Sequence, residues 1–395
     1  MLAADGRGDL LESIVRRVSQ TWPAFLVLGL GVVISVFTWR FTEQRVSSEA
    51  EVKFHHQVAQ AVGALDRRIQ DNVDLLIGLR GLFAVSGQVD RNEFQLYLSG
   101  FNIAQRFPGV RLVSFVRYVT QSQKAAFEDS VRRDRSLDPL GYPDFTIRPP
   151  GVRDEYMVVT YIEPLAGNER AFGFDVFSEP QRRPSVELAR DRGQATASEP
   201  IWLAADPQKQ ISLALRMPVY RRDLSVTTVA ERRAAFLGVV SSAIRVDDLV
   251  GSLLGRQLGS DFDLVIHDLG DSGMAAPAAE PILMFDSGRS IGRKAVKPGE
   301  HFFLDQVMTL EVAGRNWRLE FRAPFTPTYG IVGELPQVIL LGGIVTSLLL
   351  FWVVLAQSLA RSRALQLAEH ATAVRAAEGL REQLAFIQQL IETVP

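Results

Sequence analysis

The segment Arg153-Asp154-Glu155 holds the neighbouring carboxylates that could do chemistry in this chain. Two carboxyl groups on one substrate can act as general acid and general base. Adjacent residues of an extended chain point to opposite faces, however, so Asp154 and Glu155 are poorly placed to share a substrate. We therefore interpret the segment as a structural network at the start of a strand, and we predict no catalytic residue in this chain.

Metal and cofactor chemistry is also not expected. The chain has no cysteine, which excludes disulfides, zinc–thiolate sites and cysteine nucleophiles. The five histidines are scattered, and the neighbours His55 and His56 diverge by about 100° on a helix, which makes them a poor chelating pair. No glycine-rich phosphate loop or nucleophile elbow is present. His370 lacks the charged residue and proline turn that usually follow a phosphoacceptor, so we interpret it as a solvated helix position.

Asp175 is a side chain that could make a polar contact to a ligand. It lies between Phe174 and Val176, so strand alternation turns its carboxylate away from these apolar neighbours. A carboxylate near a pocket is costly unless a donor meets it, and a ligand N–H can be that donor. The alternative is an exposed aspartate at a strand end, or a cap for the following turn.

Two charge-free runs frame the chain, from Val18 to Trp39 and from Leu335 to Ala360. Each is long enough to cross a hydrocarbon core, which takes ~20 apolar residues. Arginines precede the first run and follow the second, which predicts that both ends are cytoplasmic and the middle is outside. No small-x-small cleavage site follows the first run promptly, so we expect an uncleaved anchor. The net charge of −2 gives no reason to expect a nucleic acid partner.

The elements between the runs alternate between helix and strand. From about Thr42 to Phe83, apolar residues at three- and four-residue steps predict a long helix, packed on its own domain or on a second subunit. We expect further helices at 91–98, 123–134, 184–192 and 247–258. We expect strands at 110–119, 156–162, 171–177, 210–220, 236–244, 262–267 and 282–285, and a hairpin of 303–312 and 316–322 about Gly314. This order is typical of small sensor modules of the PAS kind.

The C-terminal segment is predicted to be a helical connector. Leu380, Leu384, Ile387 and Ile391 follow the 4-3-4 step of a coiled-coil seam. With the long helix after the first span, this predicts a homodimer through stalk and connector helices. We expect an output domain beyond Pro395, preceded by a cytoplasmic PAS domain.

Several ordered blocks resemble the CHASE family of extracytoplasmic sensor domains. These blocks are Gly78 to Gly87, Phe107-Pro108-Gly109-Val110, Arg153-Asp154-Glu155-Tyr156, Gly173-Phe174-Asp175, Pro200-Ile201 and Pro218-Val219-Tyr220. The family includes plant cytokinin receptors, bacterial sensor kinases and diguanylate cyclases, and its membrane-distal PAS-like unit binds the ligand. The resemblance implies that Asp175 contacts the ligand, that Tyr161 lines the pocket, and that the backbone at Ala197 and Ser198 contributes.

The expected fold class is α+β, with two transmembrane helices flanking an extracytoplasmic domain made of a long stalk helix and two PAS-like units. The predicted segments are a tail (1–17), the first span (18–40), the stalk (41–86), a distal ligand-binding unit (87–222), a proximal unit (223–330), the second span (335–360) and the connector (361–395).

The predicted function is that of a membrane receptor in a bacterial inner membrane with a periplasmic sensor domain. It is expected to bind a small molecule, for which an adenine- or cytokinin-like compound is one candidate, and to signal to an output domain, for which a histidine kinase is expected. The alternatives are the sensor part of a diguanylate cyclase or phosphodiesterase, or a protein-binding ectodomain without a small-molecule ligand.

Overall fold

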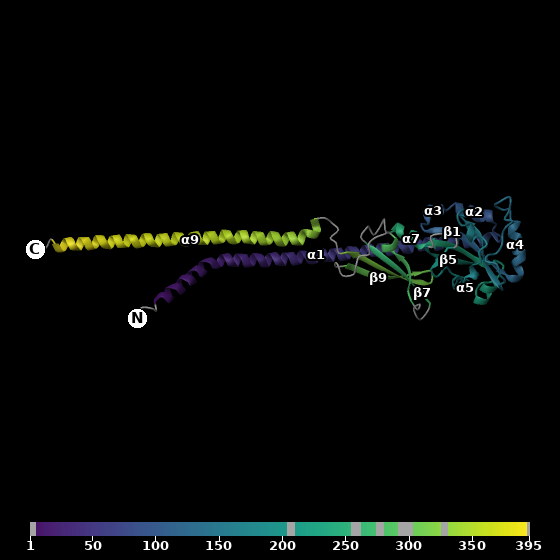
Figure 1. Ribbon diagram of the computed structural model, residues 1–395, viewed down its shortest axis with the longest axis horizontal. Helices are drawn as coiled ribbons and strands as arrows, with labels where there is room; N and C mark the ends of the chain where they lie inside the picture. The colour runs from purple at the N-terminus through teal and green to yellow at the C-terminus, as the bar shows by residue number, and fades with distance from the viewer. Residues whose placement is uncertain are drawn as a thin grey trace. The chain divides into compact units, whose positions relative to one another are not determined.

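The computed structural model describes residues 5–203, 210–253, 262–273, 280–290, 303–324 and 331–392. The chain divides into two compact units, one formed by residues 1–50 with 326–395 and the other by residues 51–325. We call them the helical unit and the α/β unit (Figure 1). Mixed helix and sheet agrees with the predicted α+β class.

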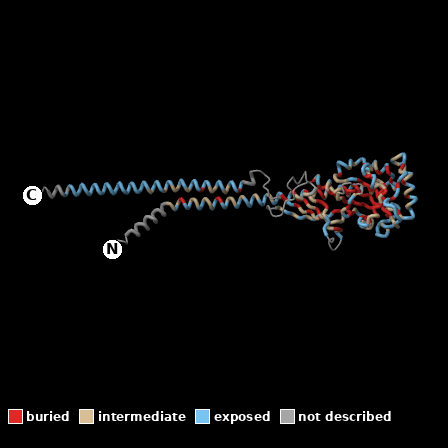
Figure 2. The backbone as a smooth tube through the Cα atoms, in the orientation of Figure 1, coloured by how far each residue is buried: buried red, intermediate tan, exposed pale blue. Residues whose placement is uncertain are grey.

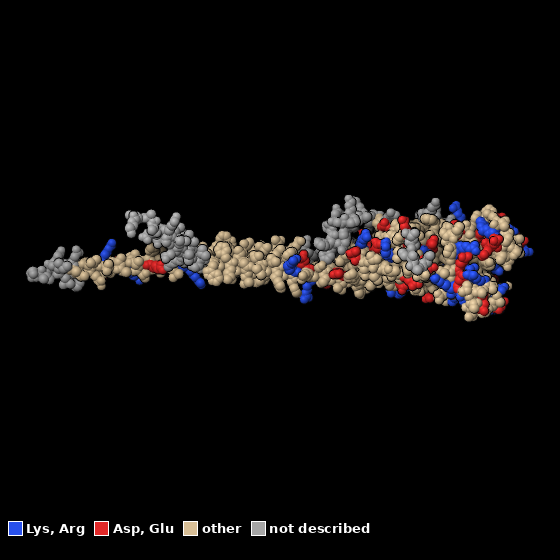
Figure 3. Space-filling model, turned by 90° about the horizontal axis from the view of Figure 1, so that it is seen from below, with Lys and Arg blue, Asp and Glu red and all other residues tan. Residues whose placement is uncertain are grey.

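The helical unit consists of the N-terminal part of α1 (Asp5–Ser86) and of α9 (Ile331–Glu392). Both helices contain stretches long and apolar enough to cross a membrane, with mean hydropathies of 2.0 and 2.7. Only 11% and 6% of these stretches are buried, so they are not the core helices of a soluble domain. Figure 2 shows these stretches mostly as exposed or intermediate. Figure 3 shows a stretch of the helical unit without lysine, arginine, aspartate or glutamate.

Small residues bring the two apolar stretches together. A Cβ atom added at Gly31 would meet Ser347, and one added at Gly343 would meet Ser35. Both serines are buried, and each donates its hydroxyl to the carbonyl of its own helix four residues earlier. Glycine and serine at such contacts let two helix backbones approach closely inside a membrane.

The α/β unit contains the C-terminal part of α1 and two antiparallel sheets. Its other helices are α2 (Arg91–Ser99), α3 (Ile103–Arg106), α4 (Lys124–Arg132), α5 (Arg183–Arg192), α6 (Val229–Ala235), α7 (Val246–Leu253) and α8 (Ser287–Ser290). The first sheet is built from β1 (Val110–Thr120), β2 (Glu155–Glu163), β3 (Thr196–Ala197), β4 (Ile201–Trp202), β5 (Ile211–Tyr220) and β6 (Phe236–Arg245). The second is built from β7 (Asp263–Asp271), β8 (Ile282–Asp286), β9 (Phe303–Val312) and β10 (Arg315–Pro324).

The first sheet has the order β2-β1-β6-β5-β3, and β4 pairs with β5 beside β3. Strand β6 lies at its centre, between β1 and β5. The predicted boundary between residues 222 and 223 therefore does not separate the two sheets. The local sequence of β6 predicts a buried strand, but it contains no signal for this long-range pairing.

The two faces of the first sheet have different partners, because alternate residues of each strand point to opposite sides. In β5, Leu213, Leu215, Met217 and Val219 belong to the cluster that includes α1. Residues on the opposite face pack beneath α5 and the segment before it, and we call this the α5 face. It carries Leu112, Val116, Val159 and Ala243, together with Val176 and Val186 from above the sheet.

The second sheet has the order β8-β7-β10-β9 and packs on an earlier part of α1. Phe54 of α1 stacks on Phe262, with the two ring centroids 5.4 Å apart. The hairpin of β9 and β10 turns at Ala313 and Gly314, as the sequence predicts. Because α1 contributes to the core under both sheets, the predicted stalk is an integral core helix of this unit.

Local signals placed several elements correctly. Asp90 caps α2 through a reciprocal capping box with Glu93, and Gly193 ends α5 with a φ of 72°. The predicted strand at 171–177 is wrong. The segment forms the 3-10 turns η2 (Glu169–Ala171) and η3 (Val176–Ser178), with single bridges at Phe174 and Asp175. Gly173 between them has a φ of 80°, which interrupts an extended strand.

Candidate ligand-binding site

A cavity of about 60 Å³ lies on the α5 face of the first sheet. Its floor is formed by small side chains in the middle of three neighbouring strands, Ser114 in β1, Ala214 in β5, and Ser241 and Ala243 in β6. Larger side chains at these positions would fill the space. The remaining lining residues are Leu112, Val116, Val159, Ala171, Phe174, Val176, Arg182, Ile201, Leu203 and Arg216. The cavity is therefore mostly apolar, with a few polar groups, as is usual for small-molecule sites.

Arg216 is the charged group on the floor of this cavity. It lies two residues after Ala214 in β5, so it shares the face of the small residues and is 3% exposed. Its Nη1 donates a short hydrogen bond to the hydroxyl of Ser185 in α5. Burial, with a smaller effect from the positive charge of Arg182, lowers the pKa of Arg216 to about 9. The guanidinium is still charged at neutral pH.

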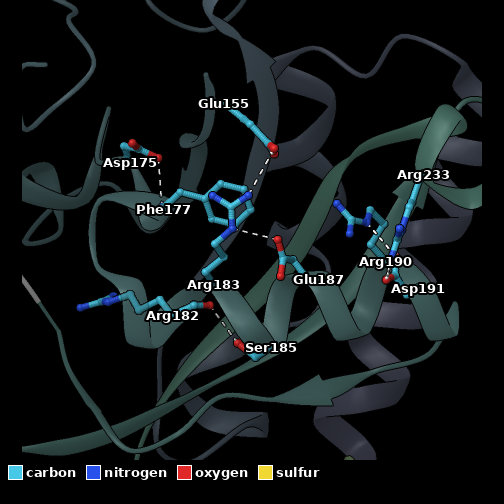
Figure 4. A network of polar contacts seen from close by, with 10 residues as sticks. All are labelled: Glu155, Asp175, Phe177, Arg182, Arg183, Ser185, Glu187, Arg190, Asp191 and Arg233. Atoms are coloured by element: carbon cyan, nitrogen blue, oxygen red, sulfur yellow. Dashed lines mark hydrogen bonds and ion pairs between the residues drawn. The ribbon is translucent and has the colours of Figure 1, made fainter. Parts of the chain in front are cut away.

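We call the part of the lining that lies over the floor the cover, and it consists of Ala171, Phe174, Val176, Arg182, Ile201 and Leu203. Arg182 belongs to this cover, just before α5. Its Nε donates to the Glu179 carboxylate at 2.6 Å, and its Nη2 donates to the carbonyl of Trp202 at 2.8 Å. Its own carbonyl accepts the hydroxyl proton of Ser185 at 3.1 Å (Figure 4). The lone pair of the Ser185 hydroxyl is thereby directed to Arg216. Arg182 is neutralised by Glu179, whereas Arg216 has no acidic partner among the described residues.

Asp175 lies in the cover between Phe174 and Val176, which both line the cavity. Its carboxylate is fully buried and accepts hydrogen bonds from the backbone N–H of Met157 at 2.8 Å and of Phe177 at 3.0 Å. The other carboxylate oxygen is 3.4 Å from Arg153 but makes no hydrogen bond. Burial raises the pKa of Asp175, and the two N–H donors and Arg153 partly oppose this.

The Arg153-to-Glu155 segment forms the predicted structural network. Arg153 faces Asp175, and Glu155 lies 3.2 Å from Arg183. Arg183 also pairs with Glu187 at 2.8 Å and covers the ring of Phe177 (Figure 4). These contacts tie the start of β2 to the cover and to α5.

Tyr161 does not lie at this cavity. A β-bulge shifts the register between Phe115 and Val116, so that Phe115 pairs with Tyr161 and Val116 with Val159. The extra residue moves Tyr161 to the α1 side of the sheet. There its hydroxyl donates to the carbonyl of Val89, and its ring lines a larger, polar hollow of about 1060 Å³.

Ala197 and Ser198 lie beside β5, and their backbone N–H groups are already used. Ala197 donates to the carbonyl of Ala313 and Ser198 to that of Ala214, both at 2.9 Å. The structure therefore does not gather Asp175, Tyr161, Ala197 and Ser198 in one cavity. Their roles in ligand binding stay predictions.

We did not predict Arg216 as a site residue from the sequence, although the sequence contains a signal for it. It is a lone arginine inside the apolar strand Ile211–Tyr220, at the same parity as Ser212 and Ala214. A charged residue almost never becomes fully buried without a partner. A cation amid such a strand therefore indicates either an acidic partner or a binding site.

The family model described as "CHASE domain" matches residues 87–285, which are about half of the chain and include the whole of the first sheet. The chain belongs to the CHASE-domain family. The cavity lies entirely within the matched CHASE residues.

Two curated proteins are similar to parts of this chain. The hybrid signal transduction histidine kinase A of Dictyostelium discoideum is 26% identical over 211 residues, 49% of this chain and 10% of that protein. The probable histidine kinase 4 of Oryza sativa subsp. japonica is 33% identical over 182 residues, 45% of this chain and 16% of that protein. The chain thus corresponds to only a small part of either relative.

The solved structures similar to this chain include an extracellular ligand binding receptor from Desulfohalobium retbaense DSM5692. It is 12% identical, covers 69% of this chain and 40% of that chain, and has a TM-score of 0.41. Similarity at that level does not define the fold of this chain.

Proposed function

We propose that this chain is the sensor part of a transmembrane receptor, and that its CHASE domain binds a small molecule in the cavity on the α5 face. The observation that carries this proposal is the cavity itself. Small residues at the centre of a well-packed sheet leave a space that is covered by the turns around Asp175 and by β4. A domain that only bound other proteins would have no need of a mostly apolar space with a buried cation on its floor.

The cover and α5 offer a route from this cavity to the second sheet. The chain continues from α5 into β3, where the N–H of Ala197 donates to the carbonyl of Ala313 at the β9–β10 turn. Arg192 at the end of α5 lies 3.7 Å from Asp271 of β7. We propose that a ligand which moves the cover shifts the second sheet through these contacts. It can do so only by its differential affinity for two arrangements.

The two relatives are named as histidine kinases, which supports a histidine kinase as the output of this receptor. The apolar parts of α1 and α9 support insertion of the receptor in a membrane, with the CHASE domain outside the cytoplasm and the connector inside. We propose the two sheets as the distal and proximal PAS-like units of the sensor, with β6 reassigned to the distal one.

Filling the cavity tests the proposed function. Ala243→Leu places a larger apolar side chain on the cavity floor, and Ala234→Leu makes the same change at an exposed position of α6. The full-length chain in lipid nanodiscs is screened by thermal shift against neutral and charged metabolites, purines included. A ligand at 100 times its dissociation constant should add about 2.7 kcal/mol of stability.

We expect hits with the wild type and the Ala234→Leu control, and loss of every hit in Ala243→Leu. Hits that survive in a folded Ala243→Leu variant would place the ligand elsewhere. A screen without any hit would favour the protein-binding alternative.

A further inference from the structure

The chemical class of the ligand follows from the charges around the cavity, provided that the cavity is the binding site proposed above. Arg216 is buried on the cavity floor, and its hydrogen bond to Ser185 is with a neutral group. The charge that contributes to lowering its pKa is that of another cation, Arg182. Since Glu179 neutralises Arg182, the described lining keeps one uncompensated positive charge.

A buried cation without an ionic partner destabilises a folded protein. Moving a guanidinium out of water without such a partner costs several kcal/mol of folding free energy, and one hydroxyl acceptor does not offset this cost. Strand β5 otherwise consists of apolar and small residues, so a methionine or leucine would pack there at no such cost. An anionic group of a ligand would offset this desolvation cost through charge-assisted hydrogen bonds to the guanidinium.

The rest of the lining restricts what the anion is attached to. Leu112, Val116, Val159 and Leu203 offer apolar surface, while Ser114 and Ser241 add hydroxyl groups. None of the described lining residues is an aspartate or glutamate, so an ammonium group has no partner there. A single excess positive charge matches a monoanion better than a phosphate dianion.

We propose that the cavity binds small organic monocarboxylates without an amino group, with the carboxylate on Arg216 and the carbon chain against Leu112, Val116 and Leu203. Ser185 holds the guanidinium in place, and the turns around Asp175 close over the bound acid.

Matched probes test this class directly. The full-length chain in nanodiscs is titrated with sodium butyrate, butyramide and γ-aminobutyrate at constant ionic strength, and then with benzoate and benzamide. We expect butyrate or benzoate to raise the melting temperature. The uncharged amides should bind about 10- to 100-fold more weakly, since a hydrogen bond to a charged group contributes roughly 1.5–3 kcal/mol. γ-Aminobutyrate should be weakened similarly by its unpaired ammonium.

Variants of Arg216 show whether it is the anion's partner. Arg216→Met should keep or raise the melting temperature of the ligand-free chain while the carboxylate response is lost. Arg216→Gln, which can still donate to Ser185, should lose the response too, and Arg216→Lys should retain part of it. Arg111→Met, the same change at an exposed residue of β1, should leave the response intact.

Each outcome separates this inference from the proposed function. If the amides or purines bind as well as the acids, are blocked by Ala243→Leu and are unaffected by Arg216→Met, the carboxylate assignment is wrong and the proposed function stands. If neither acids nor neutral compounds change the melting temperature, both are wrong. The comparison of butyrate with butyramide in the wild type needs no variant.

Discussion

At the scale of single residues, two of the buried charged side chains on the α5 side of the first sheet, Asp175 and Arg216, differ in their partners. Asp175 is buried against two backbone donors and an arginine, so its charge has partners within the protein. Arg216 is buried against a hydroxyl and another arginine. The first arrangement holds the cover in place, and the second leaves a charge for a ligand to satisfy. The sequence drew attention to Asp175 through its family block, but burial of Arg216 depends on pairings that no local pattern contains.

We predict that Asp175 stabilises the cover mainly as a hydrogen-bond acceptor. Asp175→Ala leaves the N–H groups of Met157 and Phe177 unpaired in a buried place and should cost about 2–4 kcal/mol. Asp175→Asn keeps one carbonyl oxygen as acceptor and should cost clearly less. Chemical denaturation of the full-length chain measures both. Equal losses in the two variants would show that the carboxylate charge, and not the acceptor, is what matters.

The pH dependence of stability should carry the signature of Asp175. Its pKa is raised in the folded state, so the folded state binds its proton more tightly than the unfolded chain. This contribution to stability is fully present below the ordinary value of 3.8 and is lost as the pH rises through the folded pKa. The melting temperature of the wild type, minus that of Asp175→Asn, should therefore fall as the pH rises above 3.8. A difference that grows with pH would mean that Arg153 dominates and lowers the pKa.

At the scale of elements, local signals predicted what local forces decide. The caps of α2 and α5 and the hairpin at Gly314 follow from residue types within a few positions. The wrong strand at 171–177 has the apolar pattern of a strand, but Gly173 and the 3-10 turns beside it form a cover instead. The bulge that turns Tyr161 to the other face depends on how β1 and β2 pair, which residue spacing alone does not specify.

Packing of the two apolar helices in the helical unit gives an element-scale prediction. Because the chain has no cysteine, a pair introduced at Ser35 and Gly343 can form only its own disulfide within one chain. We expect Ser35→Cys with Gly343→Cys to cross-link rapidly in nanodiscs under mild oxidation, because these positions are in contact. Val33→Cys with Gly343→Cys is the control, since Val33 is 64% exposed. Equal rates for both pairs would contradict the packing.

At the scale of the whole molecule, the two candidate membrane helices and the CHASE family could be predicted from the sequence, since they depend on long charge-free runs and ordered blocks. The location of the cavity was not. It requires β6 to enter the first sheet and place Ser241 and Ala243 beside Ala214, although they lie more than 25 positions apart in the chain. The family resemblance predicted that the distal unit binds the ligand. Only the folded sheet shows which of its faces contains a cavity.

We predict that the receptor is a homodimer joined through its connector helix. Leu380, Leu384 and Ile387 have the spacing of a coiled-coil seam, and they are 60%, 55% and 51% exposed in the single chain. Leu384→Glu should shift the full-length chain toward monomers in native mass spectrometry, whereas Arg381→Glu, a change beside the seam, should not. A wild type that is monomeric at all concentrations tested, or a Leu384→Glu variant that remains dimeric, would contradict the prediction.

A ligand that enters the cavity on the α5 face should be covered by the segments above it. Hydrogen–deuterium exchange of the full-length chain shows this when it is measured with and without saturating amounts of the compound that gives the largest thermal shift. We expect slower exchange in residues 171–186 and at the ends of β4 and β5, with little change around Val89 and Tyr161. Protection confined to the hollow beside Tyr161, with unchanged exchange in the cover, would contradict it.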